Sequence, residues 1–255
     1  MILLRAALFQ LAFYLWTALM LVAYLPGLAC DRLVIVRGQR QWTRGAVSLL
    51  RVLAGIRLEL RGLEHRPTGT AAILAAKHQS AFDTFVFHLL LDDPAIVMKR
   101  ELLWLPIYGW YCRKTRMIVV DRKAGAAALR RLVADGKAAA ALRRPILIFP
   151  EGTRAAPDAR LPYQPGVSAL YGQLDLPVVP VALNSGLFWP RRQFIKRPGT
   201  IVIEFLPPIP PGLARPEFVA RLTAEIEAAT ARLVAEGRRG LAATAPAKTP
   251  ARSDI

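Results

Sequence analysis

Short apolar runs recur along the chain and are separated by longer stretches in which apolar and polar residues are mixed. Runs of four to seven mainly apolar residues that end in polar or glycine-containing turns are typical of strands. Such runs predict strands at Ile56–Leu60, Ala71–Ala76, Ala95–Met98, Met117–Val120, Ile146–Phe149, Val178–Ala182 and Thr200–Leu206. We therefore expect a sheet at the centre of the fold.

Helical patterns fall between several of these strands. They predict helices at Thr84–Leu91, Glu101–Arg113, Gly125–Leu142 and Val167–Leu174. Beyond the proline-rich segment 207–211, Pro216 begins a further helix whose apolar residues recur three or four positions apart. This alternation predicts an α/β fold over residues 56–236, with a largely parallel sheet flanked by helices. Residues 237–255 are rich in Ala, Pro, Thr, Lys and Arg, and we expect them to be disordered.

The N-terminal segment is one long apolar run. Residues 6–29 carry no charge, and only Gln10 and Thr17 have plainly polar side chains. As a helix this run would extend about 36 Å, enough for a hydrocarbon core of about 30 Å. A cleaved signal peptide is the alternative, but the run is too long for its apolar region, and only Arg5 precedes it. We interpret residues 1–30 as a retained membrane anchor helix.

Residues 31–55 are basic, with arginines opposed by Asp31 alone. We interpret them as a connector that includes an amphipathic helix, Gly45–Leu53, at the membrane surface. The whole chain has 35 basic and 18 acidic residues, a net charge of +17. By the positive-inside rule, the arginines that follow the anchor place the bulk of the chain in the cytoplasm, and the basic surface makes anionic membrane lipids expected partners. Nucleic acid is not expected, because neither zinc-finger spacing nor interleaved basic and aromatic residues occur.

A first polar segment, Lys77–Asp83, follows the predicted strand 71–76. A histidine with a nearby carboxylate can remove a proton from a hydroxyl. In a continuous helix His78 and Asp83 would lie about 140° apart around the axis and would not face each other. If Gln79 and Ser80 form a turn, Asp83 can orient the imidazole and leave Nε2 free as the base. The alternatives are a histidine that caps a strand and an aspartate that caps a helix.

A second polar segment, Glu151–Arg154, follows the predicted strand 146–149. A glycine beside an arginine is suited to phosphate, because backbone N–H groups and a guanidinium can both reach its oxygens. The alternative for Arg154 is a surface ion pair with Glu151 or Asp158. A base and a phosphate site together indicate an enzyme that acts on a phosphorylated alcohol.

Four segments, in order, resemble the motif blocks of the glycerolipid acyltransferases, most closely the bacterial 1-acyl-sn-glycerol-3-phosphate acyltransferases. They are His78-x4-Asp83, Lys99–Leu102 with the later Asp121-Arg122, Phe149–Arg154, and Val179–Gly186. The resemblance covers about residues 56–236. It implies transfer of a fatty acyl group from acyl-CoA or acyl carrier protein to the sn-2 hydroxyl of lysophosphatidic acid, giving phosphatidic acid for phospholipid biosynthesis. It also implies the bacterial inner membrane, with the active site on the cytoplasmic side.

The resemblance implies roles for seven residues. They are the catalytic pair His78 and Asp83, and the substrate-binding residues Glu151, Gly152, Thr153, Arg154 and Lys99. Because a thioester is already activated, we expect no cofactor and no metal ion.

Several alternatives stay open. The acceptor can be another lysolipid, such as a lyso-ornithine lipid or a lysophospholipid. The protein can instead be a membrane phosphoesterase that uses His78 and Arg154, or a lipid-binding protein without catalysis. Leu102–Tyr108 is a candidate lining for an acyl-chain channel, and Asn184 and Ser185 are candidate contacts for the acyl donor.

Overall fold

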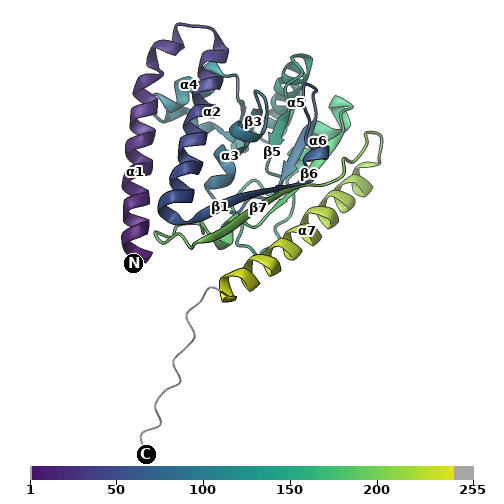
Figure 1. Ribbon diagram of the computed structural model, residues 1–255. Helices are drawn as coiled ribbons and strands as arrows, with labels where there is room; N and C mark the ends of the chain where they lie inside the picture. The colour runs from purple at the N-terminus through teal and green to yellow at the C-terminus, as the bar shows by residue number, and fades with distance from the viewer. Residues whose placement is uncertain (1, 244–255) are drawn as a thin grey trace, which may run out of the picture.

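The computed structural model describes residues 2–243 and has a seven-stranded sheet at its centre (Figure 1). The strands are β1 (Ile56–Arg61), β2 (Ile73–Ala76), β3 (Ala95–Lys99), β4 (Ile118–Val120), β5 (Ile146–Ile148), β6 (Val178–Leu183) and β7 (Gly199–Phe205). Their spatial order is β1-β7-β6-β2-β5-β3-β4, and all neighbours are parallel except β6 and β7. Each predicted strand is present within two residues of its expected ends, so the largely parallel sheet is confirmed.

The central strands are buried on both faces, which explains their unbroken apolar sequences. Successive side chains of β2 enter two different cores, because side chains alternate across a strand. Ile73 packs in the core that α5, α6 and α7 cover. Leu74 packs on the opposite face with Phe9, Ala46 and Phe85, which come from α1, α2 and α3. The sheet is therefore a middle layer between two helical layers.

Five helices of the α/β domain complete these layers. They are α3 (Phe82–Leu90), α4 (Tyr108–Lys114), α5 (Gly125–Ala141), α6 (Pro165–Leu174) and α7 (Arg215–Ala243). The single helix predicted over Glu101–Arg113 is wrong: a 3₁₀ turn, Arg100–Trp104, precedes α4. Pro106 disfavours a helical conformation of Leu105, and Ile107 has a φ of 62°, so the chain turns sharply before α4.

Helix α7 is longer than the sequence pattern indicated. It runs to Ala243, so the disorder predicted from residue 237 is wrong for residues 237–243. Alanine and leucine favour helix there, and Arg238 forms an exposed ion pair with Asp158 of the domain. The remainder of the predicted tail, residues 244–255, lies outside the described residues.

The N-terminal region forms a helical hairpin. Helix α1 (Ile2–Ala23) and helix α2 (Arg32–Leu49) lie side by side and run in opposite directions along one side of the sheet (Figure 1). Trp16 Nε1 donates to the carbonyl of Trp42 (2.9 Å), and a side chain at Gly45 would collide with the Trp16 ring. Within residues 2–243, α1 is the one helix long and apolar enough to cross a membrane.

Helix α2 is longer than the helix predicted within residues 31–55. The predicted connector is helical from Arg32, and a π-helical turn, Leu50–Ala54, follows it. The segment packs between α1 and α3, where Thr43 Oγ1 donates to the carbonyl of Phe85 (3.2 Å), and its position at the membrane surface stays a prediction. Its arginines are spread along α2 beside α1, and Arg32 pairs with Asp93 of the α/β domain (2.6 Å).

Candidate active site

The structure brings His78 and Asp83 together across the turn after β2. His78 Nδ1 lies 3.1 Å from Asp83 Oδ2. The same oxygen accepts the backbone N–H groups of Gln79 (2.7 Å) and Ser80 (2.8 Å), and Ser80 Oγ accepts from the N–H of Phe82 (3.2 Å). Asp83 is thus the second residue of α3, with its carboxylate folded back onto the turn. This geometry fixes the imidazole with its Nδ1–H directed at Asp83 and leaves Nε2 for a substrate.

The imidazole of His78 lies at the wall of a large cavity. It stacks on the ring of Phe149, with centroids 4.2 Å apart, and is nearly buried. Asp83 is fully buried. A buried carboxylate that accepts several hydrogen bonds can stabilise an imidazolium formed during proton transfer. The pair therefore has the arrangement of a general base and its orienting group.

The Glu151–Arg154 segment forms a turn directly after β5. Gly152 has a φ of 66°, which favours glycine, and its N–H donates to the carbonyl of Phe149 (2.8 Å). Gly152, Thr153 and Arg154 line the same cavity as His78. Burial and the neighbouring Arg191 lower the pKa of Arg154, so the guanidinium stands where positive charge is concentrated.

The surface ion pair considered for Arg154 is not present among residues 2–243. Asp158 pairs with Arg238, and Glu151 pairs with the buried Lys77 (2.8 Å). The Arg154 guanidinium is therefore available to an anion that enters the cavity. Glu151, which the resemblance placed among the substrate contacts, faces away from the cavity instead.

Further cations reach the cavity from other elements. Lys99 ends β3, and Arg122 donates a hydrogen bond to the carbonyl of Gly152. The sequence had singled out neither Arg191 nor Lys196, which also line the cavity. Lys196 Nζ donates to Gln10 Oε1 of α1 (3.0 Å), so this part of the wall joins the hairpin to the α/β domain. No aspartate or glutamate of the described residues lines the cavity.

The cavity has a volume of about 1220 Å³, and most of its lining is apolar. It extends from the cations between the sheet and the helical hairpin, where α1, α2 and α3 supply side chains such as Met20, Ile35 and Phe85. Part of the segment that we expected to line an acyl-chain channel also lines this cavity, namely Leu102, Leu105, Pro106 and Tyr108. A polar, cationic mouth and an apolar interior suit a substrate with an anionic head and a hydrocarbon chain.

Asn184 and Ser185 do not reach the cavity. Asn184 accepts from the N–H of Val202 (2.8 Å) and donates to the carbonyl of Leu233 (3.2 Å), so it braces the end of β6 against β7 and α7. The expectation that these two residues contact an acyl donor is therefore wrong.

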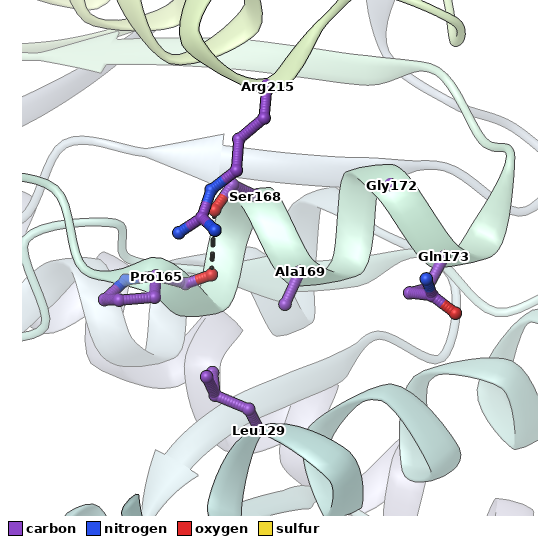
Figure 2. A pocket seen from close by; sticks show the side chains of 7 residues that line it. All are labelled: Leu129, Pro165, Ser168, Ala169, Gly172, Gln173 and Arg215. Carbon is purple, nitrogen blue, oxygen red and sulfur yellow. Dashed lines mark hydrogen bonds between the residues drawn. The ribbon is translucent and has the colours of Figure 1, made fainter. Parts of the chain in front are cut away.

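A smaller hollow of about 320 Å³ lies beside α5, α6 and the start of α7 (Figure 2). Among the described residues Arg215 is the only charged one in its lining, so these residues supply neither a base nor an orienting carboxylate there.

Comparison with known proteins agrees with this geometry. Residues 57–184 match the family model described as Acyltransferase. A 1-acyl-sn-glycerol-3-phosphate acyltransferase of Pseudomonas aeruginosa is 37% identical over 197 residues, which cover 77% of this chain and 76% of the relative. The human 1-acyl-sn-glycerol-3-phosphate acyltransferase alpha is 28% identical, with 84% of this chain and 76% of the relative covered.

The fold has a counterpart among solved structures. The crystal structure of PlsC, the 1-acyl-sn-glycerophosphate (LPA) acyltransferase from Thermotoga maritima, matches with a TM-score of 0.75. The match covers 91% of this chain and 98% of that chain at 21% identity, and it confirms the fold. The sequence match over half of the chain and the identity to the Pseudomonas relative show that the protein belongs to the acyltransferase family and is an enzyme of that class.

Proposed function

We propose that the protein transfers a fatty acyl group from an acyl thioester to the sn-2 hydroxyl of 1-acyl-sn-glycerol-3-phosphate. The observation that carries this proposal is the shared cavity of His78 and Arg154, with a cationic mouth, an apolar interior and no carboxylate from residues 2–243 in its lining. The names of the relatives support the same acceptor. A phosphomonoester matches the cations, and the acyl chains match the apolar wall.

The cations at the mouth hold and orient the acceptor. Arg154 offers a planar set of N–H donors to the phosphate, and Lys99 and Arg122 add charge from neighbouring strand ends. Holding the phosphate places the glycerol hydroxyl next to His78 Nε2. Orientation of two reactants in this way lowers the barrier by removing the entropy cost of bringing them together.

The proton and the acyl group then move in two steps. As the hydroxyl oxygen attacks the thioester carbonyl, His78 Nε2 takes its proton, and Asp83 stabilises the resulting imidazolium. The tetrahedral intermediate collapses by breaking the carbon–sulfur bond, and the imidazolium returns the proton to the leaving thiolate. The products are the diacyl ester and a free thiol, carried by coenzyme A or by acyl carrier protein. The scheme uses no cofactor, because the thioester supplies the activated acyl group.

The hairpin supports a location at a membrane, and the family resemblance implies the bacterial inner membrane with the active site on its cytoplasmic side. Leu4, Leu8, Leu11 and Leu15 are exposed on α1 to between 47% and 63%, whereas Phe9 is fully buried against the domain. An exposed apolar face of this extent is suited to the acyl layer of one leaflet. In this position α2 and its arginines stay with the domain rather than crossing the hydrocarbon core, where each charge would cost about 2.5–3.5 kcal/mol.

A radiolabelled acceptor assay tests the proposal. The purified protein is incubated with oleoyl-CoA or oleoyl-acyl carrier protein and radiolabelled 1-acyl-glycerol-3-phosphate, and lipids and released phosphate are separated. Labelled phosphatidic acid is the expected product. Phosphate release without acyl transfer would identify a phosphoesterase, and binding without turnover would identify a lipid-binding protein. A parallel series with lyso-ornithine lipid and lysophosphatidylethanolamine tests the acceptor.

A further inference from the structure

A buried ionic cluster lies behind the catalytic turn, on the side away from the cavity. Lys77, the residue before His78, is fully buried and donates all three N–H groups of its ammonium. The acceptors are Glu151 Oε1 (2.8 Å), Glu227 Oε1 (2.7 Å) and the carbonyl of Ala159 (3.1 Å). Burial of a lysine is costly unless carboxylates and hydrogen bonds compensate it. Because Lys77 directly precedes the catalytic histidine, the cluster can act on the position of that residue.

The cluster is connected directly to the backbone of His78. Glu151 Oε2 accepts the N–H of His78 at 3.4 Å, and the carbonyl of His78 accepts from the N–H of Ala155 (2.8 Å). Both backbone groups of His78 are therefore held by the segment that also presents Gly152 and Arg154 to the cavity. A rotation of the Glu151 carboxylate would move the base and the phosphate-binding turn together.

Helix α7 supplies the third charged member. Glu227 lies 150 residues from Lys77 in the sequence, and Tyr163 donates its hydroxyl to the same Glu227 oxygen (3.3 Å). Two carboxylates therefore share one ammonium. Burial raises the pKa of Glu151, whereas the ammonium of Lys77 lowers it and Glu227 adds to the rise. The ionised form of Glu151 thus depends on Lys77.

We propose that Lys77 and Glu227 are positioning residues: Lys77 keeps Glu151 ionised and oriented, and Glu227 holds the Lys77 ammonium in place, so that His78 and Arg154 keep a fixed position relative to each other. The proposal rests on the proposed acyl transfer and goes beyond it by assigning helix α7 a role in catalysis. The groups that face Glu151 are Lys77 from the end of β2, Glu227 from α7 and Tyr163 from the segment before α6.

The test compares kcat, acceptor KM and pH profile for four variants of the full chain. Lys77→Met removes the ammonium, so the pKa of Glu151 rises further and the ionised form is lost at low pH. We expect kcat at pH 7 to fall at least about tenfold, since a 1 Å misplacement can cost about 100-fold. The acid limb of the profile should move to higher pH, and activity should recover as pH rises. Lys77→Met combined with Glu227→Gln removes the second negative charge, and the acid limb should return toward that of the wild type.

Two variants of Glu227 alone keep the test decisive if Lys77→Met does not fold. Glu227→Gln keeps an acceptor for Lys77, so it should lower kcat less than Glu227→Leu, which should lower kcat in protein that is still folded by circular dichroism. Glu225→Gln is the matched control, because Glu225 lies on the same helix in an exposed pair with Arg221 (2.8 Å).

Three results would separate the possible failures. A folded Lys77→Met enzyme with the wild-type kcat and pH profile would overturn the positioning role. A loss of kcat that follows melting temperature alone, with an unchanged profile, would show a structural role instead. Absence of acyl transfer by the wild type would refute the proposed function itself, before the variants are compared.

Discussion

The phosphate contact of Arg154 is the feature that decides the substrate, and Arg154→Ala tests it. In the structure this guanidinium lines the cavity, forms no ion pair with other described residues and stands near Arg191. A hydrogen bond to a charged partner contributes about 1.5–3 kcal/mol. Its loss corresponds to an increase in acceptor KM of about tenfold to 150-fold. The KM for the thioester should hardly change, because the donor does not use this contact.

The sharpest assay compares two acceptors that differ by the phosphate alone. Wild-type enzyme should strongly prefer 1-acyl-glycerol-3-phosphate to the corresponding monoacylglycerol in kcat/KM, and Arg154→Ala should lose most of this preference. Arg154→Lys keeps the charge but loses the planar donor set, so its preference for the phosphorylated acceptor should lie between those of the wild type and Arg154→Ala. Arg192→Ala is the control for net charge, since Arg192 is exposed and does not line the cavity.

One result would refute the reasoning. If Arg154→Ala discriminates between the two acceptors as strongly as the wild type, the phosphate is held elsewhere. Lys99 and Arg122, the other cations at the ends of β3 and β4, then become the candidates, and the same pair of acceptors tests each of them.

Further predictions concern the base, its partner, the membrane face and acid stability. His78→Ala should lower kcat by about 10²–10⁴ without loss of lysolipid binding, and retention of a tenth of wild-type kcat would exclude His78 as the base. Asp83→Asn should lose most activity in the same assay, because the amide perturbs the tautomer that the carboxylate fixes. Leu8→Gln with Leu15→Gln should weaken binding to anionic vesicles but leave the melting temperature unchanged, since both side chains are exposed. Burial lowers the pKa of His88 to about 4. Between about pH 6.5 and pH 4 the unfolded chain therefore binds more protons than the folded chain, so stability should fall as the pH falls through this range. His88→Phe should reduce this dependence of the melting temperature on pH.

The local sequence pattern was sufficient to predict the strands of the sheet and the polar residues that follow β2 and β5. Buried parallel strands are continuous apolar runs, so β2 and β5 and the polar residues at their ends could be read directly from the sequence. Helix geometry required a turn between His78 and Asp83 if the two side chains were to meet, and the structure contains that turn. Within the Glu151–Arg154 segment, by contrast, the sequence could not say which side chains face the cavity. That choice depends on Lys77 and Glu227, and a contact between residues 150 positions apart leaves no local pattern.

The apolar composition of α1 shows why the N-terminal region was only partly predictable. A helix on the surface of a soluble protein has one apolar face, and its periodicity shows which side is buried. Helix α1 is apolar around its circumference, and the structure divides that surface between two environments. Phe9 and Phe13 pack against Trp189 of the domain, with ring centroids 5.4 and 5.8 Å away, while the leucines of the opposite face stay exposed. Deletion of α1 would therefore uncover a protein core as well as a lipid-binding face, so substitutions on the exposed leucines are needed to measure the membrane contribution alone.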